Sequence, residues 1–124
     1  MLDKLNIIKE DFKVYETLKE LNEETGLNID VLEKVKFNKL EILNLRWNKI
    51  SNNINILKNV NFKELKELDL YSTNISDLKV LEKADFKELE KLDLSYNDIK
   101  NIDILKNVKF KELKEFYLII RFHI

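Results

Sequence analysis

A segment of 24 or 25 residues returns along this chain, and that periodicity limits the fold more than any other feature of the sequence. The sequence Phe-Lys-Glu-Leu-Lys-Glu-Leu-Asp-Leu begins at Phe62, and close copies of it begin at Phe86 and Phe110. A more divergent copy begins at Phe37, so the four phenylalanines are spaced by 25, 24 and 24 residues. A unit of this length cannot bury its apolar face alone, whereas stacked units share one continuous core. The sequence therefore predicts a solenoid of repeats.

The second half of each unit repeats as well, and it predicts short helical segments. Residues 97–108 match residues 73–84, and the first copy differs by one extra residue between Ile50 and Ile54. In the last copy three apolar residues follow one another at a spacing of three: Ile102, Leu105 and Val108. This spacing is typical of a short α-helix or 3-10 helix that buries one side. Each unit is therefore expected to hold one strand and one helical segment.

The strand half of each unit resembles the leucine-rich repeat family through the pattern L-x-x-L-x-L-x-x-N-x-I. The residues that carry this pattern are Leu89, Leu92, Leu94, Asn97 and Ile99 in one unit and Leu40, Leu43, Leu45, Asn48 and Ile50 in another. The continuation I-x-x-L-x-x-V is similar to a short-repeat subclass found in a phosphatase regulatory subunit and in bacterial internalins, although the units here are longer. The resemblance covers residues 26–118 and implies an α/β fold, a right-handed leucine-rich-repeat solenoid. In such a solenoid a curved parallel β-sheet forms the concave face, and short helices or 3-10 segments form the convex face.

Asparagine is expected to replace glycine at the bends of the solenoid, because the chain has one glycine and no proline. The amides of Asn48 and Asn97 can satisfy backbone groups inside a bend. Thr73 stands at the same position of the unit between them, so that bend is predicted to be weaker. The phenylalanines at the start of the units are predicted to form a buried spine: Phe12, Phe37, Phe62, Phe86 and Phe110.

The whole chain, 1–124, is predicted to be a single leucine-rich-repeat domain with irregular ends. Its predicted parts are a cap or divergent repeat 1–24, a half repeat 25–36, full repeats 37–61, 62–85 and 86–109, and an incomplete last repeat 110–124. Over residues 2–22 a helical stripe of apolar side chains favours a capping helix that covers the open core. Alternatively, this segment is a divergent repeat, in which Leu18 takes the position that Leu43 has in the first full repeat. The apolar, β-prone segment 116–122 is expected to form an exposed edge.

The composition excludes several classes of function. The chain has no cysteine and one histidine, His123, so disulfides, thiol chemistry and histidine-based catalysis lack the residues they need. Its 22 basic and 23 acidic residues give a net charge of −1, which leaves no electrostatic footprint for nucleic-acid binding. No signal sequence or membrane-spanning segment is evident, so no membrane partner and a cytoplasmic location are expected. Without a catalytic constellation, neither enzyme activity nor a cofactor is predicted.

Side chains between the inward leucines are expected to point away from the core on the concave face. Trp, Tyr and Arg are the residues most enriched at binding hot spots, and several of them belong to this outward set, as does Ser95. The predicted partner-binding residues are Arg46, Trp47, Asp69, Tyr71, Asp93, Tyr96 and Tyr117. In the alternative interpretation the aromatic rings only pack against their cross-strand neighbours. No metal is predicted at the two stacked aspartates, because calcium needs six or more oxygen ligands.

These observations predict a protein–protein interaction module. It is expected to bind a macromolecular partner, namely another protein, through the concave face of the sheet. The alternative is a structural or self-associating unit, a homo-oligomer that pairs through its open C-terminal strand edge.

Overall fold

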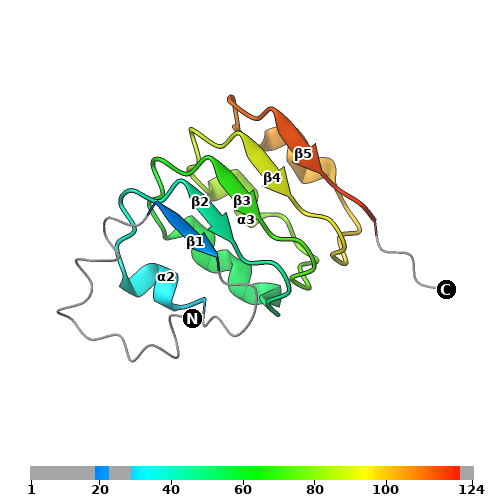
Figure 1. Ribbon diagram of the computed structural model, residues 1–124. Coiled ribbons are helices and arrows are strands. Elements are labelled where there is room, and N and C mark those ends of the chain that lie inside the picture. Colours follow the sequence, from blue (N-terminus) through cyan, green and yellow to red (C-terminus); the bar gives the residue numbers. More distant parts are fainter. Residues whose placement is uncertain (1–18, 23–28, 121–124) are drawn as a thin grey trace.

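The computed structural model describes residues 19–22 and 29–120 (Figure 1). Five short strands form one open parallel sheet in which each strand neighbours the next one along the chain. The strands are β1 (Glu20–Asn22), β2 (Ile42–Asn44), β3 (Glu67–Asp69), β4 (Lys91–Asp93) and β5 (Glu115–Tyr117). From β2 to β5 the distance along the chain between strands equals the period of the sequence repeat. The expected α/β solenoid with a parallel sheet is confirmed.

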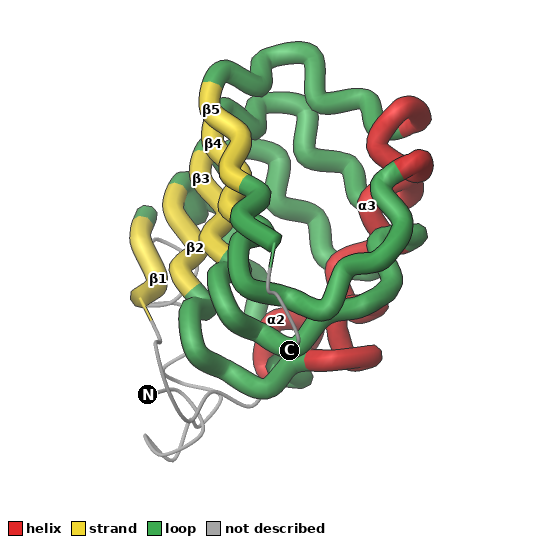
Figure 2. Tube along the Cα trace, turned by 90° about the vertical axis from the view of Figure 1, so that its right-hand side faces the viewer, coloured by secondary structure: helices red, strands yellow, loops and turns green. Residues whose placement is uncertain are grey.

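Helical segments cover the side of the solenoid that lies opposite the sheet (Figure 2). They are the α-helices α2 (Val31–Lys34) and α3 (Val80–Lys83) and the 3-10 helices η3 (Ser51–Lys58) and η4 (Asp103–Asn107). Each carries apolar side chains that belong to the core or pack against it. Leu105 and Val108 do so as predicted, whereas Ile102 is 52% exposed, so its predicted burial is wrong. The extra residue of the first full unit falls in η3, which at eight residues is the longest of the four.

The central residue of each inner strand points into the core. The Cα register places Leu43 beside Leu68 and Leu68 beside Leu92, and each of these leucines is at most 1% exposed. Their neighbours on either side are half-buried, as expected for a strand whose side chains alternate between two faces. The leucine pattern of the sequence therefore fixes which strand positions remain on the concave face.

A column of phenylalanine rings fills the core beside the turns that precede the strands. The ring centroids of Phe37, Phe62, Phe86 and Phe110 follow one another at 6.5, 6.3 and 6.2 Å. The first three rings are buried, and the last is half-buried. The predicted spine is confirmed for these four rings, whereas Phe12 lies outside the described residues.

Buried asparagine side chains hold the bends that follow two of the strands. Asn48 and Asn97 are 5% and 4% exposed. Within its own unit, Asn97 donates through Nδ2 to the carbonyl oxygens of Leu94 at 3.0 Å and Ser95 at 3.2 Å. Asn48 Nδ2 donates in the same way to the carbonyl oxygen of Leu45, at 2.9 Å. The predicted structural role of both asparagines is confirmed.

Strand β1 corrects the capping helix predicted over 2–22, because the last three residues of that range are extended. β1 pairs in parallel with β2, and Leu21, which is 5% exposed, lies beside Leu43. The alternative alignment, with Leu18 at the position of Leu43, is therefore also wrong. A strand centred on Leu21 buries a leucine and leaves both of its polar neighbours exposed, which follows the alternation of the other strands. The remainder of the predicted cap lies outside the described residues.

The last described unit leaves its side of the core uncovered. Phe116 of β5 lies in register with Leu92, yet Phe116 is 40% exposed and Leu92 is 1% exposed. Ile119 and Ile120 are also exposed, by 51% and 58%. The expectation of an exposed apolar edge is confirmed for residues 116–120, and the remainder of that segment lies outside the described residues.

Candidate functional site on the concave face

Two rows of side chains cross the strands on the concave face. We define the polar row as the last residues of the five strands, which lie in Cα register: Asn22, Asn44, Asp69, Asp93 and Tyr117. We define the aromatic stripe as Trp47, Tyr71 and Tyr96, which lie just beyond the ends of β2, β3 and β4. Parallel pairing continues to this point, since the Trp47 N–H donates to the Tyr71 carbonyl at 3.1 Å. The rows are therefore adjacent.

The three rings of the aromatic stripe contact one another in series. The centroids of Trp47 and Tyr71 are 5.2 Å apart at an interplanar angle of 68°, and those of Tyr71 and Tyr96 are 5.0 Å apart at 43°. Such tilted and edge contacts are favourable for aromatic pairs. The rings pack across strands, and yet Trp47 remains 55% exposed and Tyr96 38% exposed. The stripe is therefore both packed and accessible.

Two members of the stripe adopt a backbone conformation that is costly for bulky residues. The φ angles are 68° at Trp47 and 58° at Tyr96. This left-handed region costs an ordinary residue about 1–2 kcal/mol, and glycine and asparagine occupy it most easily. Each ring stands immediately before a buried bend asparagine, a sequence signal that could have located these positions in advance. Ser72, at the equivalent position of the unit between them, has a φ of 51°, so the conformation belongs to the bend of the repeat and these two positions differ in carrying a bulky ring.

Arg46 joins the two rows through its guanidinium group. Its Nε atom lies 3.3 Å from Oδ2 of Asp69, and its Cζ atom lies 4.1 Å from the centroid of the Tyr71 ring. The Nε atom is buried and makes no hydrogen bond, so the contact with the carboxylate is electrostatic. The guanidinium thus meets an aromatic face and an anion together, a geometry that suits arginine.

The carboxyl group of Asp69 has a raised pKa and so binds its proton more tightly than a free aspartate does. Burial raises the pKa of Asp69 above its usual range, because the charged form loses hydration. The backbone N–H of Tyr71, which donates to Oδ1 of Asp69 at 3.0 Å, and the charge of Arg46 oppose this rise. The nearby Asp93 carboxylate adds to the rise, and Lys91 opposes it. The polar row therefore concentrates negative charge where water is partly excluded.

Two of the residues predicted to point outward lie apart from the stripe. Ser95 is fully buried, and its Oγ accepts a hydrogen bond from the Ile119 N–H at 2.9 Å, so its assignment to the outward set is wrong. The small side chain is covered, and its hydroxyl satisfies a backbone donor of the next unit. Tyr117 is 44% exposed but belongs to the polar row, where the Nζ atom of Lys91 lies 5.9 Å from the centroid of its ring.

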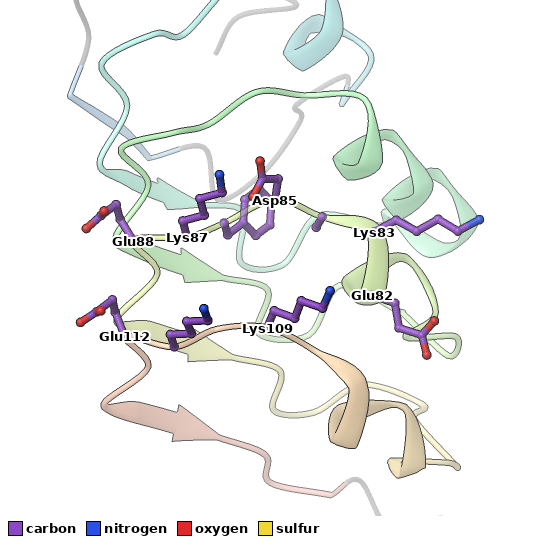
Figure 3. A pocket seen from close by; sticks show the side chains of 10 residues that line it. Glu82, Lys83, Asp85, Lys87, Glu88, Lys109 and Glu112 are labelled. Carbon is purple, nitrogen blue, oxygen red and sulfur yellow. The ribbon is translucent and has the colours of Figure 1, made fainter.

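A hollow of about 490 Å³ lies away from the concave face, beside the turns that lead into β4 and β5 (Figure 3). Four lysines and four carboxylates are among the residues that line it: Glu82, Lys83, Asp85, Lys87, Glu88, Lys109, Lys111 and Glu112. Because the two signs of charge balance, the hollow has no net charge with which to select an ionic ligand. The concave face is therefore the stronger candidate for a site.

The parallel sheet, the repeated leucines and the asparagine bends define a solenoid of the leucine-rich-repeat class. Residues 88–108, which contain β4 and η4, match the model of the Leucine Rich Repeat family. The chain matches no curated protein and no solved structure. Leucine-rich repeats are generally protein-interaction modules and generally not enzymes. The similarity to the short-repeat subclass stays an interpretation of the sequence.

Within residues 19–22 and 29–120 no helix has the length and apolarity needed to cross a membrane. In the same part of the chain, no three His, Cys, Asp or Glu side chains gather as metal ligands do. The cytoplasmic location stays a prediction.

Proposed function

We propose that this chain is a protein-binding module whose partner contacts the concave face at the aromatic stripe and the polar row. The proposed contact residues are Arg46, Trp47, Asp69, Tyr71, Asp93, Tyr96 and Tyr117. Large, half-exposed aromatic rings and arginine supply most of the binding energy at typical protein interfaces. The class of the fold agrees with this role, because repeat solenoids offer extended concave surfaces to their partners.

The observation that carries the proposal is the exposure of Trp47 and Tyr96 on left-handed backbone. An aromatic ring at such a position adds area that the core does not use, at a conformational cost that asparagine or glycine would avoid. Tyr71 contacts both rings, and the Arg46 guanidinium lies over its own ring. The stripe therefore has the rigidity that favours binding, since little side-chain entropy remains to be lost.

A displayed library of random peptides, selected on the immobilised full chain, tests this proposal. Selected binders should lose at least tenfold in affinity for the double variant Trp47→Ser/Tyr96→Ser, because hot-spot truncations cost about 2 kcal/mol or more. Ile102→Ser is the matched control, because Ile102 is 52% exposed and belongs to the convex segment. Circular dichroism establishes that each variant is folded. If binders retain full affinity for the folded double variant, the concave-face proposal is wrong.

A second candidate function, self-association through β5, has an observation of its own. Phe116, Ile119 and Ile120 form an apolar edge that no other described strand covers. In a parallel strand alternate residues bond to opposite sides, and Tyr117 and Ile119 bond to β4 through their carbonyls. The backbone groups of Phe116 and Leu118 consequently face the open edge, where a strand of a second copy can pair with them.

Light scattering on a size-exclusion column measures this self-association. The full chain should have the mass of a dimer at high concentration, and Phe116→Lys should have the mass of a monomer. Trp47→Lys serves as the control, since it places the same charge on an exposed aromatic position away from β5. A monomeric full chain at every concentration excludes this function and leaves the concave-face proposal standing.

A further inference from the structure

The charged side chains of the concave sheet are mostly acidic. Among the outward positions of β1 to β5 and the residue Arg46, the described residues include two cations and five carboxylates: Arg46, Lys91, Glu20, Glu67, Asp69, Asp93 and Glu115. Both cations are engaged. Arg46 pairs with Asp69, and Lys91 reaches toward Glu115 of the next strand, at 3.9 Å. The face therefore offers uncompensated negative charge to a ligand.

The uncompensated charge beside the aromatic stripe belongs to Asp93. Asp93 is the Cα partner of Asp69 one strand further along, and both carboxylates accept a backbone N–H two residues later through Oδ1. Asp69 has Arg46 as its cation on the preceding strand. At the corresponding position before Asp93 the chain has Tyr71, and Asp93 forms no ion pair with the cations of the described residues.

The geometry points to an arginine side chain of the partner as the group that binds at Asp93. This inference rests on the proposed concave-face function and names the chemistry of its partner: a protein segment that presents a guanidinium group. That guanidinium would pair with Asp93 and lie against the rings of Tyr71 and Tyr96. Like Arg46, which contacts both Asp69 and the Tyr71 ring, it would meet a carboxylate and an aromatic ring together.

Arginine fits this place better than other cations do. A guanidinium is planar, can donate two parallel bonds to a carboxylate, and stacks on aromatic faces, whereas an ammonium is a compact and strongly hydrated charge. A groove of about 220 Å³ runs along the polar row between β1 and β4, with Asp69, Lys91 and Asp93 in its lining. A polyanion such as a nucleic acid would be repelled by this acidic face.

Short glycine–serine peptides with a central arginine, citrulline or glutamate test the inference directly. Citrulline keeps the shape of arginine but has no charge. Trp47, the single tryptophan of the chain, lies in the stripe, so its fluorescence reports peptide binding there. The arginine peptide should bind at least tenfold more tightly than the citrulline peptide, since a hydrogen-bonded ion pair is worth about 1.5–3 kcal/mol. The glutamate peptide should bind most weakly of the three.

The variant Asp93→Asn removes the proposed anion and keeps the oxygen that accepts the Ser95 N–H. The preference for arginine over citrulline should disappear in this variant. It should persist in the control Glu112→Gln, which removes an exposed carboxylate outside the concave face.

The outcomes separate this inference from the proposed function. Equal affinity for arginine and citrulline peptides, including no measurable binding of either, overturns the inference, as does an arginine preference that survives Asp93→Asn. In those cases library-selected binders that still depend on Trp47 and Tyr96 preserve the concave-face function with a different partner chemistry. If those binders keep their full affinity for the folded Trp47→Ser/Tyr96→Ser variant, the proposed function itself is overturned.

Discussion

Asn97 forms hydrogen bonds to the preceding unit at the place where Thr73 interrupts the column of bend asparagines. Its Oδ1 atom accepts the Thr73 N–H at 2.9 Å and the Ile75 N–H at 3.0 Å. Its Nδ2 atom donates to the Leu70 carbonyl at 2.9 Å, and the Thr73 hydroxyl donates to the same carbonyl at 2.8 Å. The bend that lacks its own asparagine is thus satisfied jointly by threonine and by the asparagine of the next unit.

The substitution Asn97→Ala should therefore lower the free energy of unfolding by about 3 kcal/mol, because it leaves several buried backbone groups of two units without partners. Thr73→Val, which removes one hydroxyl and keeps the shape, should cost about 1 kcal/mol. Urea unfolding followed by circular dichroism measures both values. Equal costs for the two variants would show that Asn97 does not bridge the units.

Asp69 should make stability depend on pH with a definite sign. Burial raises its pKa in the folded state, so the folded chain binds this proton more tightly than the unfolded chain does. Stability from this group is therefore present at low pH and is lost as the pH rises from the unfolded value, about 3.9, through the raised folded value.

The variant Asp69→Asn tests this sign. We compare the free energy of unfolding of the variant with that of the unsubstituted chain at two pH values. The difference should favour the variant more at pH 7 than at pH about 3, where Asp69 is protonated in both the folded and the unfolded state. Urea unfolding at the two pH values gives the comparison, and Glu112→Gln corrects for the loss of one negative charge. If the variant instead compares more favourably with the unsubstituted chain at the low pH, the ion pair of Asp69 with Arg46 outweighs the loss of hydration.

The core could be predicted from the sequence because every unit repeats the same inward positions. Leu43, Leu68 and Leu92 occupy one register position in the sheet, as the 24- and 25-residue spacing requires. The first strand could not be placed, because Leu18 and Leu21 are both leucines and either gives an apparent match to the repeat. Only the pairing of β1 with β2 decides between them.

The exposure of Trp47 and Tyr96 was expected from the sequence, but the contacts of their rings were not. Alternation with the buried leucines assigns Tyr71 to the outward face, whereas Trp47 and Tyr96 lie beyond the strands, where left-handed backbone at the bend sets their direction. The placement of the Arg46 guanidinium between Asp69 and the Tyr71 ring depends on rotamers and on the spacing of neighbouring strands, which the sequence pattern does not encode. The burial of Ser95 was missed for a similar reason, since it involves a hydrogen bond with the next unit, which the pattern of one unit does not encode.

Trp47→Asn should leave the free energy of unfolding within about 0.5 kcal/mol of that of the natural chain. Relief of the left-handed conformation gains roughly what is lost with the ring contact to Tyr71, about 1 kcal/mol each. Tyr71→Ala loses both ring contacts and the Arg46 contact with no such relief, so it should cost about 2 kcal/mol. Thermal and urea unfolding compare the two variants. A large loss of stability in Trp47→Asn would assign the ring to folding and weaken its assignment to binding.

The phenylalanine spine should lose its contribution to stability toward the open end of the solenoid. Phe86 is 1% exposed and lies between two rings of the spine, whereas Phe110 is half-buried in the last described unit. Phe86→Ala should cost about 3–5 kcal/mol, the usual value for a buried phenylalanine, and Phe110→Ala about half as much, because its cavity opens to solvent. In a solenoid each unit contacts only its neighbours, so the smaller loss should remain local. Amide hydrogen exchange should then be faster in β5 and η4 of Phe110→Ala and unchanged in β2 and β3, whereas Phe86→Ala should raise exchange in every strand. Uniformly faster exchange in both variants would mean that the units unfold together, and that the open end is as firmly held as the centre.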